Sequence, residues 1–373
     1  MQLAIIHDYL YVYGGAERTL EHVHALWPAA PVYTLLFVRD RLPASFRAMD
    51  VRTTWVDRLP GRLRLQRLYA MLQPLAFGRL RIGGAATLLS LASFGAKAVR
   101  TPAGGTHICY CFAPPRFLWG PHSGIERERL PRPIRAASRT VEAALRRWDF
   151  QAAQRVDHFI TLSDYVRARI RRVYGRDAEV IPPPVDVGRF AAVQPRDDGY
   201  FLVIARFEAY KRIDLAIRTC ARLGLPLRIV GSGVNEAQLR RLAAGAGAST
   251  VRFLGPLPDA QVVEQLAGCR ALLFPGEEDF GLVVVEAQAA GKPVIAYGAG
   301  GALETVIPGV TGEFFGEPTV DALADALASF DARKYDPAAG RRNAARFAPD
   351  AFRRRLLAAV TRLAGGRQSS DGH

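Results

Sequence analysis

Three consecutive prolines at residues 182–184 constrain the fold of this chain more than any other feature. Proline fixes its own backbone dihedral and lacks an N–H group, so such a run cannot lie inside a helix or a central strand. It therefore predicts a linker at residues 180–186 between two folded parts, and 373 residues are enough for two domains. We expect an N-terminal domain at 1–183, a second domain at 184–345, and a C-terminal helix and tail at 346–373 that pack back toward the first domain.

Short apolar runs alternate with amphipathic segments on both sides of the linker, which is typical of parallel sheets covered by helices. The predicted strands lie at residues 3–6, 88–90, 106–111, 158–162, 200–205, 227–230, 251–253, 271–274 and 293–296. The predicted helices lie at residues 16–26, 212–222, 236–244, 259–267, 282–290 and 349–363. The fold class is therefore α/β, with two Rossmann-like, doubly wound lobes. Ligands of such folds bind where strands end, so a cleft between the lobes is the expected site.

The composition is that of a globular protein with a strong positive charge. Hydrophobic residues make up 49% of the chain, and the formal net charge is +15. Most of the basic residues are arginines, which suit phosphates and anionic membranes because guanidinium binds phosphate in a planar fork. Nucleic acid or an arginine-rich genome composition would explain the same charge. No aromatic RNA-binding signature, zinc spacing or helix-turn-helix supports nucleic acid, so we expect none as a partner.

The segment at residues 274–294 carries the most informative chemistry. A strand is predicted to end near Phe274, a loop with glycine and acidic residues follows, and a helix is predicted to begin near Leu282. The first backbone N–H groups of a helix lack internal partners and lie at the positive end of its dipole. Gly281 and Leu282 therefore predict an anion site suited to a diphosphate.

Two glutamates flank this predicted helix start. Glu286 lies about one turn into the helix, where its carboxylate would accept hydrogen bonds from ribose hydroxyls. Glu278 lies on the preceding loop and would accept bonds from the hydroxyls of a sugar beyond the phosphates. The alternative is that both glutamates only stabilise the start of the helix, because acidic side chains are favourable near any helix N-terminus.

Further cations and glycines follow the neighbouring predicted strands. Arg206 follows the strand at 200–205, and Lys211 comes at the next helix start, where a cation is unfavourable unless an anion offsets it. Gly231 and Gly233 form a tight turn after the next strand, which alone is a weak phosphate-loop signal. Solvated surface charges are the alternative explanation for the two cations.

These motifs together resemble the retaining glycosyltransferases of family 4, which have the GT-B fold. The resemblance rests on Glu278 and Glu286 with Phe280 and Gly281 between them, then on residues 290–294 and 300–304, together with Arg206, Lys211 and the proline-rich linker. It implies a nucleotide-diphosphate-sugar donor in the second domain. Arg206 and Lys211 would neutralise the diphosphate, Gly281 and Leu282 would donate N–H groups to it, and Glu278 and Glu286 would hold the sugar and the ribose. The base would lie near Leu254.

The first domain resembles a narrower, bacterial subgroup that builds O-antigen and exopolysaccharide chains, many of its members being mannosyltransferases that use GDP-mannose. Residues 7–10 with Gly14 and Gly15 match the glycine loop that faces the acceptor and the donor phosphates, and residues 110–119 match a second motif. Asp8, Pro114 and Arg116 are the candidate acceptor-side residues. Phe112 stands where the subgroup has a histidine that faces the donor sugar.

The resemblance implies transfer with retention, in which the leaving phosphate oxygen takes the proton of the acceptor. We expect neither a metal nor another cofactor, because the sequence has no Asp-x-Asp pair and Arg206 and Lys211 would replace the metal. The expected donor is GDP-mannose and the expected acceptor a lipid-linked saccharide. A UDP-linked glucose or N-acetylglucosamine donor and an inactive scaffold, which Phe112 makes conceivable, stay open as alternatives.

The expected location is the cytoplasm. The four cysteines form no C-x-x-C pair, as in reduced cytosolic proteins, and the first residues predict a buried strand rather than a signal peptide. Arginines interleave with leucines at residues 58–81, which would let the chain lie on the anionic inner face of the membrane. An ordinary surface helix with solvated arginines is the alternative for this segment.

Overall fold

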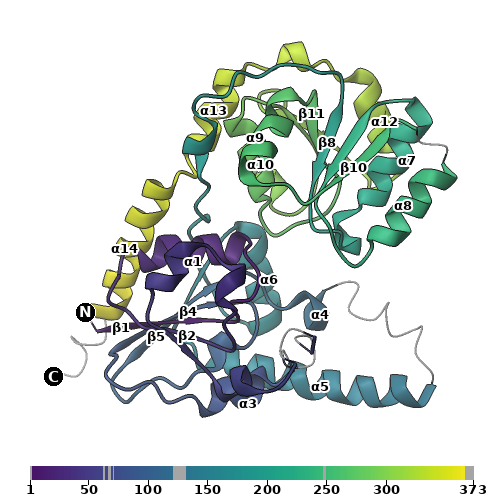
Figure 1. Ribbon diagram of the computed structural model, residues 1–373. Helices are drawn as coiled ribbons and strands as arrows, with labels where there is room; N and C mark the ends of the chain where they lie inside the picture. Colours follow the sequence, from purple (N-terminus) through teal and green to yellow (C-terminus); the bar gives the residue numbers. More distant parts are fainter. Residues whose placement is uncertain are drawn as a thin grey trace. The chain divides into compact units, whose positions relative to one another are not determined.

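The computed structural model divides into two compact units. One comprises Met1–Pro184 with Phe352–His373, and the other comprises Val185–Ala351 (Figure 1). The residues that the structure describes are 2–61, 64–65, 69, 71–120, 132–246 and 249–365. The division falls at Pro184, one residue after the expected boundary, and the second unit extends to Ala351 instead of 345.

The first unit contains a seven-stranded parallel sheet. Its strands are β1 (Leu3–His7), β2 (Val32–Thr34), β3 (Val51–Thr53), β4 (Thr87–Ala92), β5 (Thr106–Cys111), β6 (His158–Thr161) and β7 (Glu179–Val180). Their order in the sheet is β3-β2-β1-β4-β5-β6-β7, so the direction of winding reverses between β1 and β4. Every residue of β4 and β5 is buried, as expected for a parallel sheet that is covered on both faces.

The described helices of the first unit include one from the C-terminal end of the chain. They are α1 (Gly15–His24), α3 (Gln73–Arg79), α4 (Arg116–Trp119), α5 (Arg132–Gln154), α6 (Asp164–Tyr174) and α14 (Pro349–Gly365). Phe352 of α14 packs edge-on against Tyr110 of β5, with 5.9 Å between ring centroids. Arg362 donates a hydrogen bond of 2.5 Å to the carboxylate of Glu179, which ties the helix to the edge of this sheet.

A buried ion pair fastens the loop that follows β4. Lys97 Nζ lies 2.6 Å from Asp149 Oδ1, and neither side chain is exposed to solvent. The ammonium group also donates to the carbonyls of Ser93 and Phe94. Burial alone would lower the pKa of Lys97, but the carboxylate of Asp149 raises it above its ordinary value. The loop is therefore tied to α5 by a charged, fully enclosed contact.

The second unit contains a six-stranded parallel sheet with the strand order of a doubly wound Rossmann-like fold. Its strands are β8 (Phe201–Ile204), β9 (Leu227–Val230), β10 (Val251–Gly255), β11 (Ala271–Phe274), β12 (Val294–Tyr297) and β13 (Gly312–Phe315). They lie in the order β10-β9-β8-β11-β12-β13. The winding reverses between β8 and β11, and this reversal is where ligands bind in such sheets.

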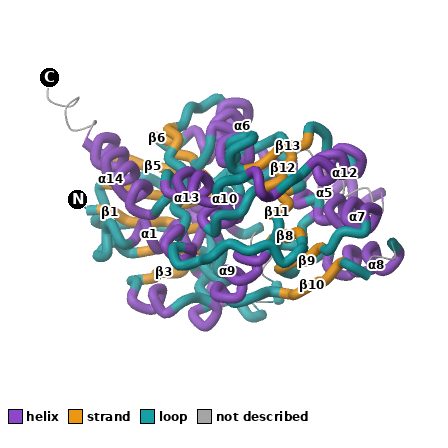
Figure 2. Tube along the Cα trace, turned by 90° about the horizontal axis from the view of Figure 1, so that it is seen from above, coloured by secondary structure: helices purple, strands orange, loops and turns teal. Residues whose placement is uncertain are grey.

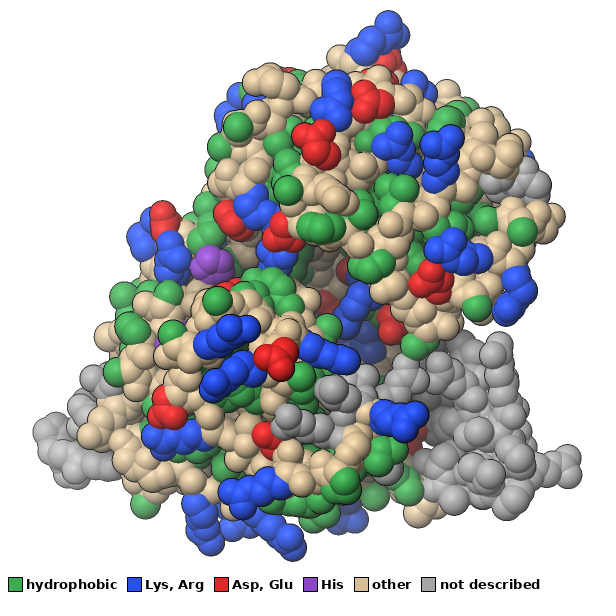
Figure 3. All heavy atoms as spheres, viewed as in Figure 1, with side chains coloured by type: hydrophobic (Ala, Val, Ile, Leu, Met, Phe, Trp, Pro, Cys, Tyr) green, Lys and Arg blue, Asp and Glu red, His purple; other side chains and the backbone are tan. Residues whose placement is uncertain are grey.

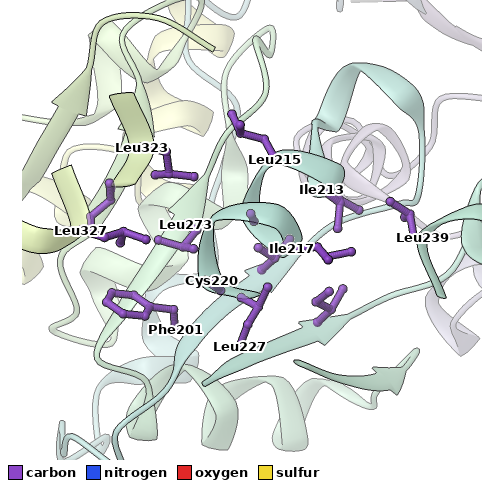
Figure 4. Packing of buried hydrophobic residues seen from close by; sticks show 14 of the residues in the cluster. Phe201, Ile213, Leu215, Ile217, Cys220, Leu227, Leu239, Leu273, Leu323 and Leu327 are labelled. Atoms are coloured by element: carbon purple, nitrogen blue, oxygen red, sulfur yellow. The ribbon is translucent and has the colours of Figure 1, made fainter. Parts of the chain in front are cut away.

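Helices cover both faces of the second sheet. They are α7 (Ile213–Leu223), α8 (Glu236–Gly245), α9 (Asp259–Gly268), α10 (Leu282–Ala289), α11 (Ala302–Thr305), α12 (Val320–Ser329) and α13 (Pro337–Ala345). α7, α8 and α12 lie on one face, and α9, α10 and α13 lie on the other (Figure 1, Figure 2). Figure 4 shows the core beneath α7, where Ile213, Ile217 and Leu323 meet strand residues such as Phe201 and Leu273.

Three features bear on the chemistry and location expected from the sequence. The four cysteines are free and buried. Within the described residues, no helix is both long enough and apolar enough to span a bilayer. Figure 3 shows Lys and Arg side chains spread over the visible face of each unit instead of gathered into one stripe.

Candidate functional site

The candidate site lies in the second unit, at the carboxyl ends of β8 and β11. These strands are neighbours in the sheet, with Leu202 opposite Leu272. The loop after β8 carries Arg206 and Lys211, and the loop after β11 carries Glu278. Carboxyl ends of adjacent parallel strands meet at one edge of a sheet, so the two loops lie together where the winding reverses.

Lys211 and Glu278 form an ion pair between these loops. Their side chains are 14% and 16% exposed, so the pair is largely shielded from solvent but remains reachable. Lys211 ends a short 3₁₀ helix, Ala209–Lys211, and the next residue, Arg212, has a φ angle of 50°. A positive φ is rare in a residue other than glycine and commonly marks a functional site.

Glycines allow three loops to approach each other closely around this pair. A Cβ atom at Gly276 would lie 2.4 Å from the carbonyl oxygen of Tyr210. A Cβ atom at Gly300, which follows β12, would lie 2.4 Å from the carbonyl oxygen of Glu278. The N–H group of Gly301 donates to this same carbonyl at 2.8 Å. The loops after β8, β11 and β12 are thus packed backbone to backbone.

The start of α10 faces the same region of the unit. Gly281 caps the helix with a φ angle of 87°, and a Cβ atom there would lie 2.9 Å from the ring of Phe274. Only glycine fits both constraints without strain. The N–H groups of the first turn, beginning at Leu282, have no carbonyl four residues earlier in the helix to bond. Val284 N–H donates to the carbonyl of Gly281 at 3.0 Å. The N–H groups of Gly281 and Leu282 are those that the sequence predicts as an anion site.

Arg206 lies two residues after the end of β8 and is exposed. The turn of Gly231 and Gly233 packs against the loop that carries it. A Cβ atom at Gly231 would lie 1.9 Å from the carbonyl oxygen of Ala205, and one at Gly233 would lie 2.6 Å from the backbone nitrogen of Phe207. The two glycines therefore serve close packing of the loops after β8 and β9.

Two residues of the expected nucleotide site, Phe280 and Leu254, are buried or half-buried. Phe280 is only 4% exposed, and its ring packs edge-on against Phe347 at 5.4 Å, so its side chain belongs to the core instead of facing a ligand. Leu254 lies half-buried on β10, which forms the edge of the sheet.

Glu286 lies on α10 beside a residue that the sequence did not single out. Arg189 Nη1 is 3.8 Å from Glu286 Oε1, and Arg189 Nη2 is 3.4 Å from Asp259 Oδ1. Arg189 belongs to the 3₁₀ helix Val187–Phe190, directly after the linker. The sequence does not predict Arg189 as a site residue, because no strand or helix pattern connects it to the other motifs.

In the first unit, Asp8 follows β1 and has a structural role. Its carboxylate accepts the backbone N–H groups of Ser93, Phe94 and Ala96 at 2.7–3.0 Å, and the residue is 6% exposed. These bonds join the loops after β1 and β4, where the winding of this sheet reverses. Asp8 was expected to meet the acceptor directly, but its oxygens are already engaged with the loop after β4.

The other first-unit candidates lie at the starts of helices. Gly14 caps α1, and its N–H group donates to Glu17 Oε2 at 2.9 Å, while Gly15 is the first residue of the helix. Arg116 begins α4. The carbonyl of Pro114, two residues earlier, accepts a bond of 3.0 Å from Arg169.

Phe112 packs among aromatic rings at the end of β5. Its ring lies edge-on to those of Tyr110 and His7, with centroids 5.5 Å and 6.5 Å away. His7 is bonded through Nδ1 to the backbone of Tyr9. An apolar contact therefore occupies the position where the resembled subgroup has a histidine.

The arrangement in the second unit is suited to a phosphorylated, hydroxyl-rich ligand. Two cations and the N-terminal end of α10 offer attraction for a diphosphate, and two carboxylates offer acceptors for hydroxyl groups. Within the described residues, no three His, Cys, Asp or Glu side chains are grouped so that they could hold a metal ion.

Two family models match the chain, and together they span residues 13–346. Residues 187–346 match the model described as "Glycosyl transferases group 1". Residues 13–189 match the model described as "Glycosyltransferase Family 4".

Individual proteins are similar over parts or all of the chain. A GDP-mannose-dependent monoacylated alpha-(1-6)-phosphatidylinositol monomannoside mannosyltransferase from Corynebacterium glutamicum is 34% identical over 46% of this chain and 52% of its own. The chain spans about half the length of the curated relatives it matches.

Solved structures share the fold over nearly the full length. Sucrose-phosphate synthase from Thermosynechococcus elongatus has a TM-score of 0.75 at 19% identity, over 97% of this chain and 99% of that one. Anabaena HepE in complex with UDP and glucose has a TM-score of 0.71 at 17% identity, with the same coverage. At these identities the likeness shows the GT-B fold alone.

Proposed function

We propose that this chain, which belongs to the glycosyltransferases of group 1 and family 4, moves a hexose from a nucleotide-diphosphate sugar to an acceptor. The observation that carries the proposal is the Lys211–Glu278 pair in front of α10, at the reversal of the second sheet. The pair combines a cation for a diphosphate with a carboxylate for sugar hydroxyls.

The proposed donor is GDP-mannose and the proposed acceptor a lipid-linked saccharide of cell-surface polysaccharide synthesis. The name of the Corynebacterium relative, which is similar over about half of this chain, supports the donor. The resemblance of the first domain to O-antigen and exopolysaccharide enzymes supports the acceptor class.

The proposed reaction proceeds with retention and uses no metal or other cofactor. The bond between the anomeric carbon and the phosphate oxygen breaks, and the acceptor hydroxyl oxygen bonds to that carbon from the same face. The departing phosphate oxygen takes the hydroxyl proton, so no protein base is required. Lys211, Arg206 and the first N–H groups of α10 would stabilise the charge that develops on the diphosphate.

A second candidate donor is a UDP-linked glucose or N-acetylglucosamine. One solved structure with the same fold holds UDP and glucose, so the donor test includes this class. Phe112, which stands in place of the subgroup's histidine, favours testing a third candidate, a non-catalytic scaffold.

A donor panel distinguishes these candidates. We expect the full chain to bind GDP-mannose, and to release GDP from it with an appropriate lipid-linked acceptor, in the presence of EDTA. Thermal shift with GDP-mannose, UDP-glucose and UDP-N-acetylglucosamine would measure binding. Release of UDP instead of GDP would select the second donor class, loss of release in EDTA would contradict metal independence, and an absence of binding to every nucleotide sugar would favour the scaffold.

We also propose that the chain acts in the cytoplasm, on the anionic inner face of the membrane. The described part of residues 54–81 exposes both basic and large apolar side chains: Arg58, Arg64, Arg79 and Arg81, with Trp55, Leu65, Met71 and Leu75. It does not form one continuous helix, because the structure has a 3₁₀ helix at Trp55–Arg58 and α3 at Gln73–Arg79. Arg62 and Arg67 lie outside the described residues.

Neutralising part of this segment should weaken membrane binding. Each arginine near an anionic surface contributes about 1 kcal/mol, so the triple variant R64Q/R79Q/R81Q is expected to bind vesicles containing anionic lipid roughly 100-fold more weakly. Co-sedimentation with phosphatidylcholine vesicles, with and without phosphatidylglycerol, measures this. The matched control R218Q/R241Q/R252Q removes the same charge from exposed arginines of the second unit. Equal weakening by both triples would contradict a role for the segment.

A further inference from the structure

Arg189 lies between two carboxylates that come from different helices of the second unit. Its two terminal nitrogens are 3.8 Å from Glu286 Oε1 on α10 and 3.4 Å from Asp259 Oδ1 at the start of α9. The side chain is 17% exposed, about as little as Glu286 at 20%. The neighbouring Phe190 is fully buried, and the guanidinium lies 5.5 Å from its ring centroid. The guanidinium is therefore within ion-pair distance of both carboxylates and is largely shielded from solvent.

The two contacted helices flank the place that the proposed function gives to a nucleoside. Asp259 comes just after β10, near which the base is expected, and Glu286 is the carboxylate expected to accept the ribose hydroxyls. A guanidinium presents several N–H groups in one rigid plane, so it can face two carboxylates at once in a fixed orientation. The three rotatable N–H groups of an ammonium do not impose that orientation.

We propose that Arg189 is a positioning residue that fixes the carboxylate of Glu286 for the ribose and thereby sets the preference for ribose over deoxyribose. The inference rests on the proposed function. A glutamate side chain that must be ordered on binding loses rotamer freedom at that moment. Arg189 restricts Glu286 beforehand, so the hydroxyl bonds form with less loss of entropy.

Two simpler roles predict different measurements. If Arg189 only tied the segment after the linker to α9 and α10, its removal would weaken the binding of every ligand of the unit equally. If it acted only by attracting the diphosphate, its removal would weaken the binding of ribonucleotides and of deoxyribonucleotides to the same extent. The ratio of the two affinities therefore isolates the positioning role, and it does not depend on how much of a variant is folded.

The test measures this ratio by calorimetry on the full chain. The probes are GDP and UDP, each compared with its 2′,3′-dideoxy counterpart. The wild type should bind the better ribonucleotide at least about tenfold more tightly than the dideoxy form, because hydrogen bonds to a charged group are strong. Arg189→Gln should bind the ribonucleotide about five- to tenfold more weakly and the dideoxy form unchanged. Arg189→Lys, which keeps the charge but not the planar fork, should recover only part of the loss.

Two further variants complete the comparison. Glu286→Ala should abolish the preference for ribose, and adding Arg189→Gln to it should change neither affinity further. The control is Arg241→Gln, which removes one positive charge from an exposed position on α8 and not beside α10. This variant should leave the ribose preference intact. In steady-state assays Arg189→Gln should raise KM for the nucleotide sugar while changing kcat little.

The measurements distinguish failure of the proposed function from failure of this inference. Binding of neither nucleotide to the wild type would overturn the proposed function and this inference together. Nucleotide binding by the wild type with an unchanged ribose preference in Arg189→Gln would overturn the inference alone. So would an equal weakening of ribonucleotide and dideoxynucleotide binding in Arg189→Gln, or a further loss of ribonucleotide affinity when Arg189→Gln is added to Glu286→Ala.

Discussion

Replacing Lys211 by alanine is expected to lower kcat by about 100- to 1,000-fold, the usual effect of removing one group that stabilises transition-state charge. In the proposed reaction, negative charge grows on the diphosphate as the anomeric bond breaks. Lys211 lies in front of α10, is only 14% exposed, and is held on a turn whose next residue has a φ angle of 50°. The cation is therefore fixed in place before the reaction begins. Initial rates at saturating donor measure the loss.

A charge-reversed double variant separates catalysis from folding. Lys211→Glu with Glu278→Lys keeps an ion pair between the same two loops but puts a carboxylate where the diphosphate needs a cation. The double variant should unfold close to the wild-type temperature and stay as inactive as K211A. Arg218→Ala, an exposed arginine on α7, should retain full activity. Recovery of activity in the charge-reversed variant would show that the pair matters only for structure.

The sequence was most informative where residue type and strand position coincide. Lys211 and Glu278 each follow a buried apolar strand, and neighbouring parallel strands bring such residues to one edge. Gly281 could likewise be predicted, because its place before an apolar helical run matches the start of a helix. The fold class is confirmed for the same reason: the short apolar runs predict β8, β9 and β11 to within one residue at each end.

Other features depend on contacts that no local pattern encodes. Arg189 reaches Glu286 from a distant segment, and Arg212 has a left-handed backbone without the glycine that would announce it. Phe280 lies within a site motif, yet its ring is buried in the core. These outcomes are decided by tertiary packing, which overrides what the residue type alone suggests.

Several elements of the structure were not predicted. Some strands are too short, and one helix is marked mainly by the residues that cap its ends. β2, β3 and β7 have two or three residues each, too few for an apolar period to appear. α6, by contrast, carried readable signals. Ser163 caps its start by accepting the N–H group of Val166, and Gly175 ends it with a φ angle of 65°. The serine and the glycine together mark both ends of this helix in the sequence.

The largest stability effect is expected at Asp149 in the first unit. Its carboxylate accepts Lys97 Nζ at 2.6 Å, Trp119 Nε1 at 2.8 Å and the hydroxyl of Tyr174 at 2.7 Å. Removing one partner of a buried pair leaves an uncompensated charge, which typically costs about 3–5 kcal/mol. Since Asp149 also joins α4, α5 and α6, D149N should unfold roughly 6–20 °C below the wild type, a drop that calorimetry would detect.

Neutralising the lysine as well should restore part of this stability. In K97M/D149N no buried charge remains, and the asparagine oxygen can still accept bonds from Trp119 and Tyr174, so the double variant should be more stable than the two single losses predict by at least about 1 kcal/mol. D50N, which breaks an exposed ion pair with Arg52 in the same unit, should leave the unfolding temperature nearly unchanged. Strictly additive losses at positions 97 and 149 would contradict this account. In that case the cost of D149N would come from packing around α5, not from a buried lysine left without its counterion.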